Sequence, residues 1–152
     1  MSTQRNKIKV GVIGASGYTG GELIRLLLNH PKVELVFAQS HTNKGKYINE
    51  IHSDLFGQTN MKFTEKIYGG IDSAFLCLGH NMSREFLNKN EIDEKVKIID
   101  LSQDFRVSRS HRKRNFVYGL SEFEKTKIIK TNSVANPGCF ATTIQLSLLP
   151  LA

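Results

Sequence analysis

Three glycines recur at every third position near the start of the chain, directly after an apolar run. Residues Ile8–Ile13 predict a buried strand and the residues from Tyr18 onward predict a helix, so the glycines form the turn between them. Glycine permits backbone angles that a Cβ forbids, and it lets the backbone approach a pyrophosphate closely. The N–H groups and the positive end of the helix then face the phosphates. The candidate cofactor-binding residues of this turn are Gly14, Ser16, Gly17, Tyr18, Thr19 and Gly20.

The frame Gly-x-x-Gly-x-x-Gly departs by one residue from the Gly-x-Gly-x-x-Gly of dinucleotide-binding folds. Two interpretations are therefore open, a dinucleotide-binding turn or a purely structural tight turn. The position directly after a strand favours the first. A P-loop is excluded, because no Gly-Lys-Ser or Gly-Lys-Thr follows.

The end of the second predicted strand, residues 33–38, bears on the choice between NAD and NADP. In NAD-binding folds an acid there binds the ribose 2′-hydroxyl and would repel a 2′-phosphate. This strand continues into Gln39 and Ser40 without an acid, and Lys44 and Lys46 follow. We expect Ser40 to hydrogen-bond a 2′-phosphate whose charge a lysine balances. The sequence therefore predicts NADP as the cofactor.

Cys139 follows residues 136–138, Asn-Pro-Gly, at the predicted start of a helix over residues 139–149. The thiolate is the nucleophilic form of cysteine, and a helix N-terminus stabilises it. Cys139 is therefore the candidate catalytic nucleophile, with a small buried residue at a helix start as the alternative interpretation. Beside a nicotinamide, such a cysteine indicates thiohemiacetal or thioester redox chemistry. Cys77 lies inside an apolar strand and is predicted to be an inert core residue.

A basic stretch without acids runs from Phe105 to Asn115. Three interpretations are open: a solvated face, a docking site for a phosphate or carboxylate, and a nucleic-acid-binding patch. Interleaved aromatics and a recognisable nucleic-acid-binding motif are missing, so we expect no nucleic-acid partner. The basic residues are Arg106, Arg109, His111, Arg112, Lys113 and Arg114.

Strands and helices alternate along the chain and predict the fold class, an α/β, Rossmann-like, doubly wound and mostly parallel sheet in one domain. Phe86 and Leu87 are expected to face inward from a helix over residues 83–90, whereas residues 39–64 predict no clear element. The predicted strands are residues 8–13, 33–38, 72–78 and 96–101, with short candidates at 127–130 and 133–135.

Composition limits the class of protein. The 152 residues are 39% hydrophobic, enough for a core, and carry a net charge of +7, which favours anionic partners. No apolar run approaches the ~20 residues of a membrane helix, and residues 1–9 lack the apolar stretch of a secretion signal. Two cysteines and five histidines show no zinc-like spacing. We expect a soluble, cytoplasmic protein without a metal site or a membrane partner.

Four segments, in this order, resemble the N-acetyl-γ-glutamyl-phosphate reductases of arginine biosynthesis. The resemblance covers residues 7–152. The wider superfamily includes aspartate-semialdehyde dehydrogenase, but Tyr-Thr in the glycine turn and Asn-Pro-Gly-Cys favour the arginine enzyme. The segments are residues 14–20, 99–106, 117–122 and 136–142.

The resemblance implies a reductase that turns N-acetyl-γ-glutamyl phosphate into the semialdehyde: Cys139 attacks the acyl phosphate, and NADPH reduces the resulting thioester. It also implies that residues 1–152 form the NADP-binding domain of a longer, homo-oligomeric enzyme. A second α+β domain, absent from this chain, then supplies the general acid/base histidine and much of the substrate pocket. We therefore expect the chain alone to turn over poorly or not at all.

Some assignments have alternatives. Gly79 stands where the family usually has proline, and His80 is either a site residue or a helix-start histidine. Asp104 and Arg106 either shape the substrate side or make structural pairs. The function has two alternatives, another acyl-phosphate or semialdehyde dehydrogenase and a non-catalytic nucleotide-sensing module. The N-acyl group of the substrate is left open.

Overall fold

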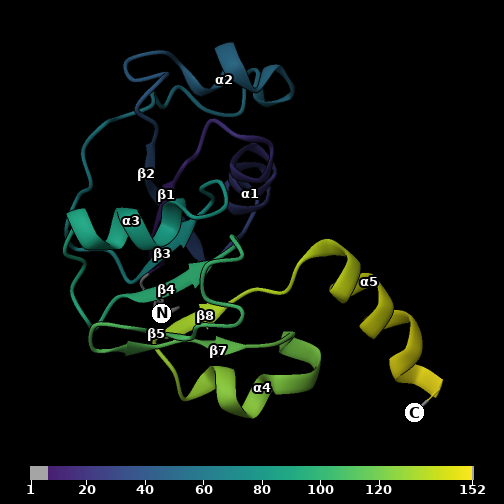
Figure 1. Cartoon of the computed structure of the whole chain (residues 1–152). Helices are drawn as coiled ribbons and strands as arrows, with labels where there is room; N and C mark the ends of the chain where they lie inside the picture. Colours follow the sequence, from purple (N-terminus) through teal and green to yellow (C-terminus); the bar gives the residue numbers. More distant parts are fainter. Residues whose placement is uncertain (1–6, 152) are drawn as a thin grey trace, which may run out of the picture. The chain divides into compact units, whose positions relative to one another are not determined.

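The computed structural model describes residues 7–151 and divides into two compact units, Met1–Cys77 and Leu78–Ala152. Each unit combines parallel strands with helices (Figure 1). The predicted Rossmann-like α/β fold class is confirmed. The glycine turn belongs to the first unit and Cys139 to the second.

In the first unit, β1 lies between β2 and β3 and runs parallel to both, which confirms the predicted strand–helix–strand unit. Ile13, the last residue of β1, pairs with Gln39 of β2 and Leu76 of β3, so three carboxyl ends of strands share one edge. The elements are β1 (Ile8–Ile13), α1 (Tyr18–Leu28), β2 (Val33–Gln39), α2 (Ile48–Ile51), the 3-10 helix η1 (Ser53–Leu55) and β3 (Ser73–Leu76).

Gly11 of β1 leaves room for the ring of Phe37 on β2. A Cβ on Gly11 would lie 2.3 Å from Cζ of Phe37, and Phe37 is almost completely buried. The register between the two strands shifts between Val10 and Gly11. The ring thus fills the space that a side chain at position 11 would need.

The segment between β2 and β3, for which the sequence predicts no clear element, packs back onto this core. Ile48 of α2 and Leu55 of η1 are fully buried. The segment escapes prediction because its few apolar residues are isolated among polar ones. The buried core of this unit consists of Val10, Val12, Ala15, Ile24, Leu27, Ala38, Ile48, Leu55 and Phe63.

In the second unit, β8 lies between β4 and β7 and runs parallel to both, whereas β5 and β6 form an antiparallel hairpin. Leu87 is buried on α3 as predicted, whereas Phe86 is only half-buried. The elements are α3 (Met82–Lys89), β4 (Lys97–Asp100), β5 (Ser110–His111), β6 (Arg114–Asn115), β7 (Val117–Tyr118), α4 (Ser121–Ile129), β8 (Ser133–Ala135), α5 (Cys139–Leu148) and the 3-10 helix η2 (Leu149–Leu151).

The predicted short strand at residues 127–130 is wrong. Residues 127–129 are the last residues of the helix α4, and Lys130 is its C-cap. Glu122 and Glu124 lie in the first turn of α4 and Lys127 in the last, an order that complements the helix dipole. The β-branched pair at 128–129 is too short to outweigh this pattern, and no residue of α4 is buried.

Aromatic side chains form the centre of the second unit. The rings of Phe105 and Phe116 stack with their centroids 3.9 Å apart, and His111 meets Phe105 edge-on. The guanidinium of Arg84 lies over the ring of Phe105, with its central carbon 4.7 Å from the ring centroid. This packing anchors the basic stretch, which folds as the β5–β6 hairpin.

Candidate functional site

The glycine turn joins β1 to α1 in a conformation that needs glycine at two positions. Gly14 has a φ of 75°, in the left-handed region. A Cβ on Gly20 would lie 2.7 Å from the backbone of Ala15, so a side chain there would push the helix away from the turn. The turn is therefore tight, and α1 starts immediately against it.

The N-terminus of α1 is open to an anion. Gly17 is the N-cap and offers no side-chain cap, and the first turn contains no acid. The first intrahelical bond runs from the Gly21 N–H to the Gly17 oxygen at 2.9 Å, which leaves the N–H groups of the three preceding helical residues without an intrahelical acceptor. Tyr18 is 98% exposed, so its side chain leaves the helix end uncovered. This arrangement fits the pyrophosphate of a dinucleotide.

The end of β2 contacts the same turn through three polar groups. The hydroxyls of Ser16 and Ser40 lie 2.8 Å apart, and the Gln39 Oε1 accepts a hydrogen bond from the Gly14 N–H at 3.3 Å. The Gln39 carbonyl also accepts from the Ala15 N–H at 2.8 Å. All the predicted cofactor-binding residues are therefore brought together within the first unit.

A carboxylate with no local sequence signal, that of Glu65, lies beside this corner. The Lys44 ammonium is 2.7 Å from a carboxylate oxygen of Glu65, and the ring of His41 is 3.4 Å from the other. The hydrogen bond and the charge of Lys44 lower the pKa of Glu65. Glu65 arrives here because the Ser40 N–H donates to the Thr64 carbonyl at 2.8 Å, a pairing distant in sequence. Lys44 is therefore already paired with an acid.

His52, which lies between α2 and η1, is a second residue that contacts the turn and carries no local sequence signal. Its Nε2 lies 3.0 Å from the carbonyl oxygen of Ala15, and its ring packs edge-on against Phe63. A Cβ on Gly21 would lie 2.5 Å from the His52 Nδ1. The ring therefore fills the space between the turn, α1 and the core.

Cys139 is exposed and begins α5 as predicted, after the N-cap Gly138. The first turn of α5 has no acid, and Gly138 makes no side-chain cap bond. Cys77 is half-buried at the edge of the first unit's core, rather than fully inside it. The exposed thiol at a helix start is thus the one of the two cysteines with free access.

Arg106 holds the segment that leads to Cys139. Its Nε donates to the Asn136 carbonyl and its Nη2 to the Leu101 carbonyl, each at 3.1 Å. A Cβ on Gly138 would lie 2.7 Å from the Arg106 Nη1, so glycine is needed for the guanidinium to lie here. Arg106 therefore makes structural bonds next to the turn that precedes Cys139.

Asp104 caps α3 from a distant segment. Its Oδ1 accepts from the Asn81 N–H at 2.6 Å and its Oδ2 from the Arg84 N–H at 3.0 Å. Arg84 returns the contact, since its Nη2 donates to the Asp104 carbonyl at 3.2 Å. Of the two interpretations of Asp104, the structure shows a structural pair. His80 is exposed just before this helix.

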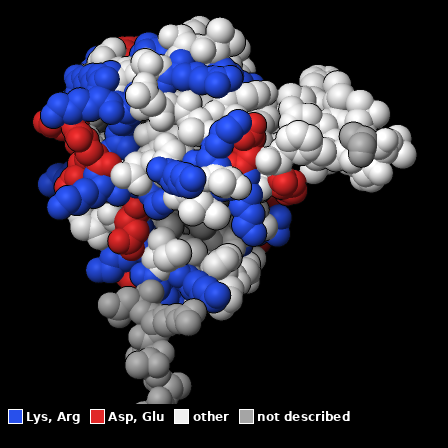
Figure 2. All heavy atoms as spheres, turned by 90° about the horizontal axis from the view of Figure 1, so that it is seen from below, with Lys and Arg blue, Asp and Glu red and all other residues white. Residues whose placement is uncertain are grey.

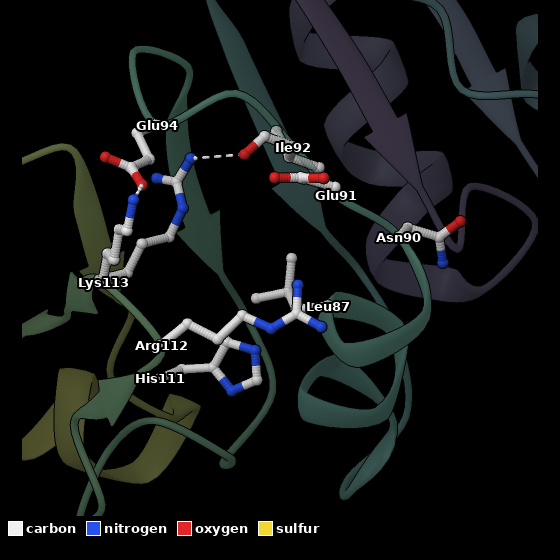
Figure 3. A pocket seen from close by; sticks show the side chains of 9 residues that line it. Leu87, Asn90, Glu91, Ile92, Glu94, His111, Arg112 and Lys113 are labelled. Atoms are coloured by element: carbon white, nitrogen blue, oxygen red, sulfur yellow. Dashed lines mark hydrogen bonds and ion pairs between the residues drawn. The ribbon is translucent and has the colours of Figure 1, made fainter.

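Four residues of the basic stretch line a pocket of about 140 Å³ between the end of α3 and the β5–β6 hairpin (Figure 3), namely His111, Arg112, Lys113 and Arg114. Arg114 donates to the carbonyls of Val96, Ile92 and Asp93, and Lys113 pairs with Glu94 at 3.3 Å. Burial, followed by nearby arginines, lowers the pKa of the lining residue His111. Arg114 and Lys113 are therefore already engaged in contacts within the second unit.

Charge is mixed on the face of the molecule that Figure 2 shows. In Figure 2 the lysines and arginines lie among aspartates and glutamates. Within residues 7–151, no helix is long and apolar enough to cross a membrane. In the same residues no three His, Cys, Asp or Glu side chains are grouped to hold a metal ion.

Comparisons with known proteins extend this picture. Residues 9–131 match the family described as semialdehyde dehydrogenase, NAD binding domain. A Flavobacterium johnsoniae protein named N-acetyl-gamma-glutamyl-phosphate reductase is 53% identical over 147 residues, which cover 95% of this chain and 45% of that protein. A Christiangramia forsetii protein of the same name is 50% identical over 145 residues, with 95% and 44% covered. The chain thus spans less than half the length of these relatives.

Solved structures show the same fold at low sequence identity. The crystal structure of aspartate semialdehyde dehydrogenase II from Vibrio cholerae has a TM-score of 0.74 and 19% identity over 96% of this chain and 42% of that one. The structure of aspartate semialdehyde dehydrogenase with NADP from Candida albicans has a TM-score of 0.60 and 18% identity over 85% of this chain and 42% of that one.

Proposed function

Because the chain belongs to the family of semialdehyde dehydrogenase NAD-binding domains, we propose that it is the cofactor-binding part of an NADPH-dependent N-acetyl-γ-glutamyl-phosphate reductase. The observation that carries this proposal is the uncapped, acid-free N-terminus of α1 at the glycine turn. The name shared by relatives about 50% identical over 95% of the chain supports this substrate over others of the family.

The glycine turn holds the cofactor in this proposal. The N–H groups of Tyr18, Thr19 and Gly20 donate to the pyrophosphate, and Ser16 adds its hydroxyl. Ser40 and Lys44 bind the 2′-phosphate, which requires Lys44 to exchange Glu65 for the phosphate. The reduced nicotinamide supplies a hydride to the carbonyl carbon of the substrate.

Cys139 is the nucleophile in this proposal. Its thiolate attacks the γ-carbonyl carbon of the acyl phosphate, a carbon–sulfur bond forms, and inorganic phosphate leaves with the electron pair of the broken carbon–oxygen bond. The product of this step is a thioester on Cys139. Reduction of the thioester and cleavage of the carbon–sulfur bond then release the semialdehyde and regenerate the thiolate.

We assign further parts of the activity to the longer protein that the relatives represent. Residues 1–152 are its cofactor domain, and a second domain supplies the general acid/base group and the rest of the pocket. We also place it in the cytoplasm as a homo-oligomer. Sedimentation velocity on the longer protein checks the assembly, and a monomer would contradict it.

Calorimetric titration of the chain with NADPH and NADH tests the cofactor assignment. We expect tighter binding of NADPH, because Ser40 and Lys44 contact only the 2′-phosphate. Two variants are titrated in parallel. Ser40→Ala removes the proposed 2′-phosphate contact, and Ser133→Ala, a substitution in the second unit, is the control. Tighter NADH binding would overturn the preference for NADP.

Incubation of the longer protein with N-acetyl-γ-glutamyl phosphate, without NADPH, tests whether Cys139 is the nucleophile. We expect release of phosphate in a single turnover and an N-acetylglutamyl group on the peptide that contains Cys139, seen by mass spectrometry. Cys139→Ser should abolish both, whereas Cys77→Ser should leave both unchanged. Acylation of neither cysteine in the longer protein would support a non-catalytic nucleotide-sensing module instead.

A further inference from the structure

We infer that His52 is a positioning residue for the dinucleotide turn, through the carbonyl group of Ala15. This inference rests on the proposed function, since it assigns how the turn is kept ready for the cofactor. His52 does not touch the cofactor in this scheme. It acts on the peptide group between Ala15 and Ser16, and the contact is a hydrogen bond of 3.0 Å from Nε2 to the Ala15 oxygen.

The hydrogen bond defines which ring nitrogen carries the proton. A carbonyl oxygen only accepts, so the Nε2 of His52 must be the donor. Its Nδ1 faces α1 at Gly21, where a Cβ would lie 2.5 Å away. The ring also packs edge-on against Phe63, with the centroids 6.0 Å apart. Three neighbours therefore fix the ring, and its donor points at the turn.

The peptide plane transmits this contact to the cofactor side. A peptide group is planar, so its carbonyl and its N–H point in opposite directions. Fixing the Ala15 carbonyl toward His52 therefore fixes the Ser16 N–H away from it. The Ala15 N–H is held as well, by the Gln39 carbonyl at 2.8 Å. Within residues 7–151 the Ser16 N–H has no acceptor, so it remains free for a phosphate oxygen.

Gly21 is part of the same device. Gly20 lets α1 approach the turn, and Gly21 lets the same helix approach the His52 ring. Both glycines are buried, although glycine in a helix interior costs stability relative to alanine. The two glycines therefore weaken α1, and Gly21 leaves the space that the His52 ring fills behind the turn.

The test compares two substitutions of His52 in the 152-residue chain. His52→Leu keeps apolar volume and removes the donor, whereas His52→Gln keeps an N–H donor at similar reach. We expect His52→Leu to weaken NADPH and NADH binding equally, by about three- to ten-fold, the usual worth of one hydrogen bond. His52→Gln should recover most of the affinity. His30→Leu, a histidine exposed after α1, is the matched control and should bind normally.

A spectroscopic readout separates positioning from packing. The ¹H–¹⁵N signal of Ser16 in the cofactor-free chain should shift in His52→Leu and return toward its original position in His52→Gln. Where His52→Leu does not fold, His52→Asn replaces it, because its amide is too short to reach Ala15. A Ser16 signal unchanged by the loss of the donor would overturn the inference.

The outcomes also distinguish the inference from the function. If the unsubstituted chain binds NADPH and His52→Leu binds it as tightly, only the inference fails. Equal loss of affinity in His52→Leu and His52→Gln, matched by equal loss of unfolding midpoint, also overturns it, since packing alone then explains the effect. If the unsubstituted chain binds neither cofactor, the proposed function fails and the inference fails with it.

Discussion

At the scale of single residues, the two cysteines differ in access. Cys139 is exposed at the start of α5, whereas Cys77 is half-buried against the first unit's core. We expect iodoacetamide to label Cys139 at least about ten times faster than Cys77, because alkylation needs an accessible thiolate. Mass spectrometry of the two peptides over time measures the ratio. Equal and slow labelling would argue against a nucleophile at position 139.

Glu65 competes for the lysine that we assign to the 2′-phosphate of NADPH. Its carboxylate forms an ion pair with that lysine, Lys44. Glu65→Gln should therefore tighten NADPH binding by about two- to five-fold and leave NADH binding unchanged, in keeping with the modest strength of exposed ion pairs. Glu34→Gln makes the same charge change on an exposed part of β2 and serves as the control. Weaker NADPH binding in Glu65→Gln would show that Glu65 orients Lys44 instead of competing for it.

The candidate site could be predicted from the sequence only where its residues are neighbours in the chain. The glycines, Ser16 and Cys139 stand in local patterns that carry a physical meaning. His52 and Glu65 have no such pattern, because chain folding between β2 and β3 brings them to the turn. Their roles appear only once the backbone is known.

At the scale of elements, α3 depends on a cap from outside its own sequence. Its N-cap, Asn81, has a φ of 66° and makes no side-chain cap bond, so Asp104 accepts the free N–H groups instead. Asp104→Ala should lower the free energy of unfolding by about 1 kcal/mol, the usual worth of a cap. Urea unfolding measures it, with Glu91→Ala as the control for a lost carboxylate. A stability equal to that of the control would contradict this role.

The strands and helices differ in how far the sequence predicts them. Runs of β-branched residues in β1, β2 and β4 predict strands, because buried parallel strands need little else. The hairpin β5–β6 was outside such rules, since each strand has two residues and its basic side chains bind carbonyls elsewhere in the unit. The sequence predicts no helix over residues 121–129, because none of the residues of α4 is buried and its apolar residues therefore show no core-facing pattern.

At the scale of the whole molecule, one buried acid makes stability depend on pH. Asp100 is fully buried at the end of β4, and burial raises its pKa above the usual aspartate value, although Ser102 donates to both carboxylate oxygens. A raised pKa in the folded state means that folding favours the protonated form. The stabilising contribution is therefore complete at pH values below the ordinary aspartate pKa and is lost as pH rises through the raised one.

Asp100→Asn tests this dependence, because asparagine cannot ionise. The stability of the variant relative to the parent chain should increase as the pH rises from about 4 to 8, whatever the offset caused by the altered hydrogen bonds with Ser102. Urea unfolding at several pH values measures the difference. A constant difference across this range would show that Asp100 does not titrate differently on folding. Asp72→Asn, an acid in the first unit outside this buried site, is the control.

The contact between Gly11 and Phe37 restricts the order in which the sequence can diverge. A Cβ at position 11 would lie 2.3 Å from the Phe37 ring, which is almost completely buried. A descendant that first acquires alanine at position 11 must displace the Phe37 ring, whereas one that first acquires a smaller residue at position 37 creates a cavity that alanine can then partly fill. The two single substitutions thus carry different costs, overpacking at position 11 and a cavity at position 37, so the effect of alanine at position 11 is contingent on the residue at position 37.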